Sequence, residues 1–467
     1  KKVIKDVQIL WQTKDAIGNN SKGDLVKIIP NEQYPLHSEI TVKTNKEGNA
    51  LIGAFNKDDE IIWSWHIWIR DNDPSNVGNA IVYTTYRWEG DKVVNGDTIQ
   101  GKIYSWQQAQ DDFKNELIED PSYDRVPGYA IMPCNLGALD NEPSNVNNYN
   151  AVVRTHGMIY QWGRKDPFPA VSRSDSSNTF EAQSTKFTSS STDPHYDYTN
   201  NRKIDQTGEF GTQTEGSSAS DPKVSFYSVT GNTYNSLEES LKFSINNPLV
   251  YICGTENPSI GYTDLGSSKK YFADGDWMRE HSNKLWGGKD PDLSNMRYYT
   301  FTLKEKDRHI FDNYGDKKTI FDPCPTGWRV PPGDLWLGFT KTGLNPKDCG
   351  GLTGVNYDVV KTANKTYGMY MYMTKSKWDP SDKTGNKFIS DPGPSLYFPC
   401  QGTRNGDGST RRPQHCGNYH NATCDLDNIV NILHIHLDRD VFNIFEYDYR
   451  IILKSVAGPI RCVRDRK

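Results

Sequence analysis

The chain has no long apolar run and little excess charge of either sign. Its 467 residues include 54 Lys and Arg against 59 Asp and Glu, a formal net charge of −5. A protein that binds nucleic acid is usually strongly basic, so this balance argues against nucleic acid as a partner. No stretch approaches the roughly 20 apolar residues of a membrane-spanning helix. The strongest, Ile61–Ile69, has only the length of a strand, so we expect no membrane span in this chain.

The motifs of several large enzyme classes are also missing. There is no Gly-x-Gly-x-x-Gly after a strand, no Walker loop, no His-Glu-x-x-His and no Gly-x-Ser-x-Gly. The eight cysteines contain no Cys-x-x-Cys pair, which argues against zinc-ribbon or thioredoxin chemistry. We therefore expect no catalytic residues, no metal centre and no cofactor. A structural calcium ion stays open, although the candidate loop at 379–390 has its glycine in the wrong position for an EF-hand.

Aromatic residues, glycine and proline are the abundant classes. Hydrophobic residues make up only 35% of the chain and the mean hydropathy is −0.76, yet aromatic residues reach 12%. Such a chain can still build a core, because each aromatic ring buries roughly 150–250 Å². The 38 Gly and 25 Pro favour long loops. A Ser/Thr/Asn-rich stretch at about 171–222 has few large aliphatic residues and is typical of an insertion.

Local patterns predict strands near the N-terminus and two helices further along. Short β-branched runs predict strands at 7–11, 24–29 and 39–43. Both faces of Ile61–Ile69 are apolar, which predicts a central strand with His66 as a hydrogen-bonded core residue rather than a ligand. A capping box opens a helix at Ser236, and a second, short helix is predicted from Asp334.

Soft metal ligands gather in one segment, with two histidines and two cysteines within ten residues: His415, Cys416, His420 and Cys424. Imidazole and thiolate suit zinc or copper, but the spacing matches no standard finger and the neighbouring residues predict an exposed loop. His434 and His436 share a strand face, for which an edge or half-exposed strand is the simpler interpretation. We therefore predict no metal site at either place.

Three strings carry a resemblance to a known family: TIFDPCPTGWRVPPGDLW (319–336), LYFPCQGTRNGDG (396–408) and IRCVRD (460–465). Together they resemble the Fibrobacter-type major paralogous domain of Bacteroides-group surface proteins, including fimbrillin-like proteins. NLGAL (135–139) and IYQWGRKDPFP (159–169) look like earlier segments of that family. The resemblance implies a domain at 48–467 that includes the insertion. Residues 1–47 would precede it as a β-stranded segment, a remnant or edge of a β-sandwich domain.

The resemblance implies a fold and a scaffold. The fold is α+β and β-rich: a C-type-lectin-like mixed sheet, as in formylglycine-generating enzymes, with few helices and very long loops. In that layout Cys324 and Cys462 are neighbours, so we predict a disulfide between them, as suits an exported domain. The resemblance also implies which residues form the scaffold: Cys324, Pro325, Gly327, Trp328, Arg329, Pro331, Arg404, Arg461 and Cys462.

The function implied is a non-catalytic, fimbria-associated or adhesin-like module. It would lie on the extracellular face of the outer membrane or on a fimbrium, and bind a glycan, an extracellular protein or other fimbrial subunits. Exposed rings stack on sugars and anchor protein partners, although each ring can instead pin a loop to the core. The candidate ligand contacts are Trp286, Tyr370, Tyr372, Trp378 and Asp407.

Two alternatives stay open. One is a formylglycine-generating-enzyme-like, metal-dependent oxidase, for which Cys416 and Cys424 are the candidate copper ligands. The other is a structural pilus subunit that polymerises by strand exchange.

Overall fold

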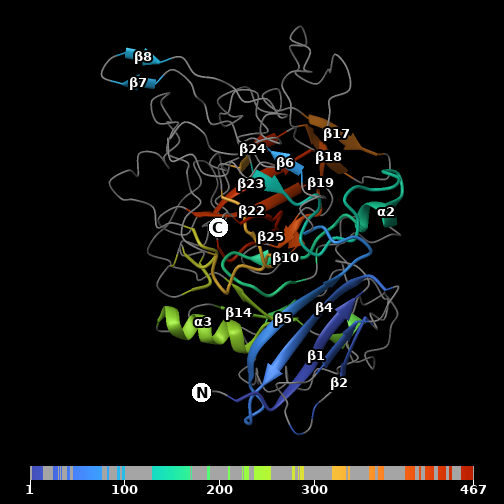
Figure 1. Cartoon of the computed structure of the whole chain (residues 1–467), viewed down its shortest axis with the longest axis vertical. Helices are drawn as coiled ribbons and strands as arrows, with labels where there is room; N and C mark the ends of the chain where they lie inside the picture. Colours follow the sequence, from blue (N-terminus) through green and yellow to red (C-terminus); the bar gives the residue numbers. More distant parts are fainter. Residues whose placement is uncertain are drawn as a thin grey trace.

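The structure is a computed structural model of the whole chain. It describes residues 3–13, 25–29, 31, 33, 39–42, 46–75, 81–83, 92–94, 97–99, 129–168, 170, 187–189, 209–210, 223–224, 226–230, 236–253, 276–278, 282, 284–288, 318–332, 335–336, 357–362, 367–372, 395–404, 410–411, 416–424, 430–437, 441–443 and 454–465. In these residues the chain forms small, mostly antiparallel sheets and two helices, which confirms the β-rich class with few helices (Figure 1).

The largest sheet lies at the N-terminal end of the chain. Its antiparallel strands β1 (Asp6–Thr13), β4 (Gly48–Phe55) and β5 (Ile61–Ile69) are extended by the short parallel strands β12 (Glu209–Phe210) and β13 (Lys223–Val224). β1 is hydrogen-bonded to β4 along most of its length, so the sheet crosses the boundary expected at residue 47.

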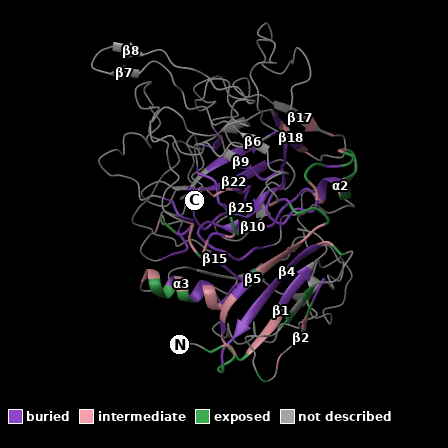
Figure 2. Ribbon diagram, viewed as in Figure 1, coloured by how far each residue is buried: buried purple, intermediate pink, exposed green. Residues whose placement is uncertain are grey.

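A hairpin covers part of this sheet. It consists of β2 (Val26–Ile29) and β3 (Glu39–Val42), so all three strands predicted in the first 47 residues are confirmed. Leu25 and Val26 pack against Ala50 and Ile52 of β4 in a small core of their own. The opposite face of the sheet contributes Trp11 and Leu51 to the main core, which continues as far as Cys462. The sheet and the rest of the molecule therefore share one hydrophobic core. Figure 2 shows that β4 is buried along its length.

β5 is not the central strand that its apolar sequence predicts. It is the last strand in the order β13-β12-β1-β4-β5 of this sheet, and Trp65 is 40% exposed. An apolar strand is accommodated there because its faces have different partners. Trp68 donates from Nε1 to the carbonyl of Ala138 in the body of the molecule, whereas Ile67 packs on the small core beneath the hairpin. Helix α3 (Leu237–Asn246) packs against the same strand.

The remaining strands form short sheets. Two of them have four strands, in the orders β16 (Trp328–Arg329)-β26 (Val463–Arg464)-β9 (Tyr129–Ile131)-β6 (Ile81–Tyr83) and β10 (Ile159–Gln161)-β25 (Ala457–Pro459)-β20 (Thr403–Arg404)-β21 (Thr410–Arg411). Three have three strands, in the orders β17 (Tyr357–Lys361)-β18 (Tyr367–Tyr372)-β19 (Ser395–Pro399), β22 (Cys416–Cys424)-β23 (Val430–His436)-β24 (Val441–Asn443) and β11 (Phe187–Ser189)-β14 (Phe226–Thr230)-β15 (Val250–Cys253). The last is the pair β7 (Lys92–Val94)-β8 (Asp97–Ile99). Segments far apart in sequence are thus neighbours throughout the body.

Both described helices begin at a side-chain cap. Ser236 Oγ accepts a hydrogen bond from the backbone N–H of Glu239 at 3.2 Å, so the predicted start of α3 is confirmed. α2 (Tyr149–Val153) is capped by Asn148 in the same way. Asp334, where the second helix was expected, lies outside the described residues. Neither described helix has the length and apolar character needed to cross a bilayer.

Candidate functional site

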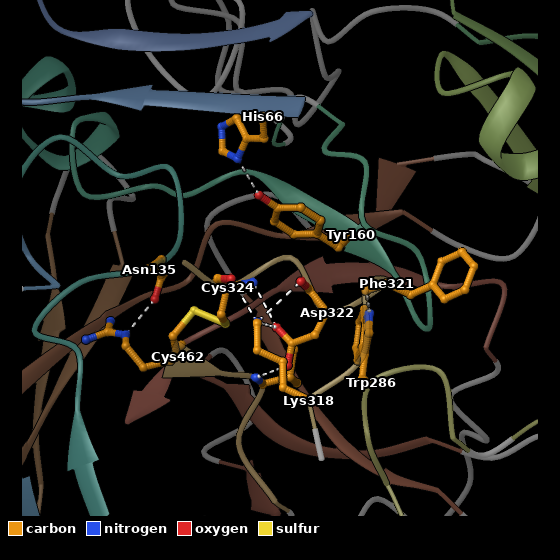
Figure 3. Close-up of a disulfide and its surroundings, with 11 residues drawn as sticks. His66, Asn135, Tyr160, Trp286, Lys318, Phe321, Asp322, Cys324 and Cys462 are labelled. Atoms are coloured by element: carbon orange, nitrogen blue, oxygen red, sulfur yellow. Dashed lines mark hydrogen bonds and ion pairs between the residues drawn. A yellow bond between two sulfur atoms is a disulfide. The ribbon is translucent and has the colours of Figure 1, made fainter. Parts of the chain in front are cut away.

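The motif at residues 318–332 forms a tight corner around one buried carboxylate. Asp322 accepts hydrogen bonds from the backbone N–H groups of Cys324 at 2.8 Å and Val330 at 2.9 Å. Lys318 Nζ donates a further hydrogen bond to the same carboxylate at 2.6 Å (Figure 3). Burial raises the pKa of Asp322, and Lys318 opposes that shift. Gly327 turns the chain with a φ of 79°, a conformation that glycine adopts without strain.

The predicted disulfide between Cys324 and Cys462 is confirmed. Their Cα atoms are 6.0 Å apart, and the bond joins the corner to the segment before β26 (Figure 3). Backbone pairing of β16 with β26 reinforces this link, and the Pro331 carbonyl accepts from the N–H of Ala422 on β22. Trp328 is buried and donates from Nε1 to Ser75. These contacts give the corner a structural role.

A buried network around Arg461 holds several distant segments together. Its guanidinium donates to Asn135 Oδ1 at 2.8 Å, to the Pro133 carbonyl at 2.9 Å and to the Tyr397 carbonyl at 2.7 Å. Asn135 Nδ2 in turn donates to Gln401 Oε1 at 2.9 Å. Burial lowers the pKa of Arg461, and the guanidinium also lies 4.5 Å above the ring of Phe398.

The amide of Gln401 extends this network to Gly157, since it both accepts from and donates to the backbone of that residue at 2.9 Å. We call Asn135, Gly157, Gln401 and Arg461 the Arg461 frame. Asn135 and Gln401 were missed as scaffold residues, although both stand in the strings that carry the family resemblance. Their only sequence signal is a polar residue at the end of an apolar run, LGAL after Asn135 and LYFPC before Gln401.

Two further scaffold arginines are also buried. Arg329 donates to the Gly287 carbonyl at 3.0 Å and lies 3.5 Å from the carboxylate of Asp465. Burial lowers the pKa of Arg404 to about 9. The backbone carbonyl of Arg404 accepts from the hydroxyl of Tyr251 at 3.4 Å.

Trp286 is a core residue, which corrects its prediction as a ligand contact. The side chain has no exposed surface and its ring lies 5.5 Å from that of Trp162. Its Nε1 donates to the carbonyl of Arg164 at 3.2 Å and to that of Phe321 at 3.1 Å, and Figure 3 shows Trp286 beside Phe321. A tryptophan in a Gly-rich, polar segment therefore pins that segment to the core, the alternative noted for such rings.

Tyr370 lies on β18 and is half-buried. The Tyr370 ring lies 5.0 Å from that of Tyr397 on β19, its direct partner in the sheet. The Tyr397 hydroxyl is buried over Gly368, where an added Cβ would lie 2.1 Å away, and it makes no hydrogen bond to the described residues. Trp378, Asp407 and the side chain of Tyr372 lie outside the described residues.

The Cys- and His-rich segment is a buried strand and not the exposed loop that was predicted. Cys416 and His420 are fully buried on β22, which pairs with β23 in register. β23 pairs with β24 on its other side, so it is central in this sheet, and His434 is 3% exposed. The edge-strand interpretation of His434 is therefore wrong. The prediction failed because the alternation of residue types along a strand does not show which other strands lie on either side of it.

Other candidate ligands stay separate in the described part of the chain. There, no three His, Cys, Asp or Glu side chains are grouped so that they would hold a metal ion. His415 and the side chains of Cys424 and His436 lie outside the described residues.

His66 is hydrogen-bonded, as predicted. Its Nε2 lies 2.9 Å from Asn49 Oδ1 and its Nδ1 lies 2.9 Å from the Tyr160 hydroxyl (Figure 3). Burial lowers the pKa of His66 to about 3, so the ring is neutral at physiological pH. The histidine thereby joins β5 to β10.

A buried ion pair that sequence reasoning missed lies nearby. Lys165 Nζ is 2.6 Å from Asp166 and also donates to the Ser64 carbonyl and hydroxyl, while its charge lies over the ring of Trp63. Burial lowers the pKa of Lys165, and Asp166 opposes that shift. These contacts link β5 to the segment after β10.

The chain matches none of the protein-family models, curated proteins or solved structures with which it was compared.

Proposed function

We propose that the protein is a non-catalytic, adhesin-like binding module with a C-type-lectin-like fold. It is displayed at the outer membrane or on a fimbrium of a Bacteroides-type cell and binds a glycan or an extracellular protein. The proposal rests on the resemblance of its motifs and on the roles of its polar residues. The side chains of the corner and of the Arg461 frame connect distant segments, which is the work of a scaffold.

The observation that supports ligand binding is the partly exposed side chain of Tyr370. A tyrosine offers a ring that stacks on the apolar face of a sugar and a hydroxyl that bonds to its polar edge. Tyr397 backs the Tyr370 ring at 5.0 Å, and the fully buried Met369 and Met371 anchor the opposite face of the strand. A ring held in this way loses little conformational entropy when a ligand binds.

The test is a glycan array and a panel of extracellular proteins, probed with and without calcium. Wild type should bind at least one ligand, and Tyr370→Ala should weaken that binding by about tenfold or more. Tyr367→Ala is the matched control, because Tyr367 is half-buried on the opposite face of β18. Binding that is absent from wild type, or equal in the two variants, would contradict the proposal. Thermal unfolding of each variant shows that its fold is intact.

The oxidase and the pilus subunit remain predictions. The oxidase rests on Cys416 and Cys424, of which only the Cys416 side chain is described, and that side chain is fully buried. Strand exchange would require a donor segment, and each strand that the structure describes is paired within the chain.

A further inference from the structure

One face of the β22–β23 ribbon is polar although it is buried. Asn418 lies directly opposite His434 in the antiparallel register, and Cys416 is two residues from Asn418 on the same face. Cys416 and Asn418 have no exposed surface, and His434 is 3% exposed. We call these three residues the thiol–imidazole cluster. A thiolate is a soft metal ligand and an imidazole suits zinc and copper, so the two side chains placed together away from water form a candidate metal site.

The reactive atoms of the cluster converge on one point. Cys416 Sγ lies 3.7 Å from His434 Nδ1 and 3.3 Å from Asn418 Oδ1. His434 Nδ1 is 2.5 Å from the same amide oxygen. Cys416 is not part of a disulfide. The thiol sulfur and the ring nitrogen are thus close enough to bind a single small ion, and the amide of Asn418 lies against both.

We infer that the thiol–imidazole cluster binds a thiophilic d¹⁰ cation, Zn²⁺ or Cu⁺. An ion about 2.3 Å from sulfur and about 2.05 Å from nitrogen would hold ligands 3.7 Å apart at an angle of about 115°. That angle lies between the tetrahedral and trigonal values, so the separation of the two ligand atoms suits one ion. The site differs from that of the oxidase alternative, because the partner of Cys416 is His434 and not Cys424.

The amide of Asn418 supplies a second, independent observation. Its Nδ2 is buried and makes no hydrogen bond within the described part of the chain. Buried polar atoms without partners are uncommon and often mark an ion or water site. When the metal displaces the thiol proton, rotation of the amide lets Nδ2 donate to the thiolate. Metal binding thus gives this atom the partner that it lacks, and the imidazole proton resides on Nε2.

The experiment titrates the full-length chain, with its disulfide intact, in competition with a chromophoric chelator. One arm uses Zn²⁺ and the other uses Cu⁺, kept reduced by ascorbate without oxygen. Co²⁺ replaces Zn²⁺ as a spectroscopic probe, since a thiolate ligand gives a charge-transfer band. We expect one equivalent to bind in at least one arm. Cys416→Ser should abolish the Co²⁺ band, and His434→Gln should weaken binding by about 100-fold.

Cys134→Ser is the matched control, because Cys134 is also a buried thiol but accepts a hydrogen bond from Arg70 at 2.8 Å. This variant should bind metal like wild type. The inference is overturned if wild type binds no equivalent in either arm, or if Cys416→Ser binds as wild type does. Should Cys416→Ser not fold, mass spectrometry of wild type decides: bound metal must slow alkylation of Cys416, and unchanged alkylation overturns the inference.

Discussion

The Arg461 frame and the thiol–imidazole cluster are both polar and both buried, but they differ in how many of their polar atoms have a hydrogen-bond partner. In the frame, Nε and both terminal nitrogens of Arg461 have an acceptor, and both amide atoms of Asn135 are engaged. In the cluster, Asn418 Oδ1 is close to two donors while Nδ2 has no partner in the described structure. A satisfied network makes a rigid scaffold, whereas a partly satisfied one has capacity for a ligand.

The largest effect should follow from breaking the frame. Arg461→Met leaves three buried oxygen acceptors without their charged donor, and hydrogen bonds to charged groups are worth about 1.5–3 kcal/mol each. We expect a loss of about 4 kcal/mol or more in the free energy of unfolding, measured by urea denaturation.

Arg154→Met is the control for that loss. Arg154 also forms ion pairs, with Glu47 and Asp140, but its side chain is 40% exposed. Exposed ion pairs contribute about 1 kcal/mol or less, so this variant should unfold nearly as wild type does. Equal losses in the two variants would remove the distinction between the frame and an ordinary surface contact.

A smaller effect, dependent on pH, is expected beside the frame at His156. Its ring is buried, neither nitrogen bonds to a described residue, and burial lowers its pKa to about 3. Below the unfolded pKa of about 6.5 the unfolded chain takes up a proton that the folded chain does not, so stability falls as the pH decreases from about 6.5 towards 3. This linkage costs about 2 kcal/mol at pH 5.

His156→Leu should remove that cost. We expect the variant to be close to wild type at pH 7.5 and about 2 kcal/mol more stable at pH 5, by urea denaturation at both values. The same pH dependence in variant and wild type would show that His156 has a partner or is protonated in the folded state.

The smallest effect should come from the cluster itself. Asn418→Leu keeps the approximate volume but removes the oxygen on which Cys416 and His434 converge. Because the Cys416 thiol can donate instead to His434 Nδ1, 3.7 Å away, the free energy of unfolding without metal should change by only about 1 kcal/mol. The measurement is urea denaturation in the presence of a chelator. A loss of unfolding free energy as large as that of Arg461→Met would mean that the polar atoms of the cluster are as fully hydrogen-bonded as those of the frame.

Local features of the sequence predict local structure well. Ser236 caps a helix as its spacing with Glu239 indicates, and the first three strands form where β-branched runs predict them. The disulfide followed from the resemblance, because that layout brings Cys324 and Cys462 together.

Long-range placement was much harder to predict. Asn135, Gln401 and Arg461 meet across hundreds of residues, and no periodicity specifies which polar side chains will pair. Trp286 is buried and β23 is central for the same reason: the neighbours that cover them come from distant segments. The thiol–imidazole cluster was missed because residues 416–424 have the composition of a loop.

The bond between Cys324 and Cys462 has a consequence for a protein exposed to proteases. Its two cysteines are separated by 138 positions in the chain, an interval that contains β16 to β25. A single cleavage anywhere in that interval leaves two fragments that remain covalently joined, with the final strand still held in its sheet. A nicked molecule therefore keeps both fragments together until the bond is reduced.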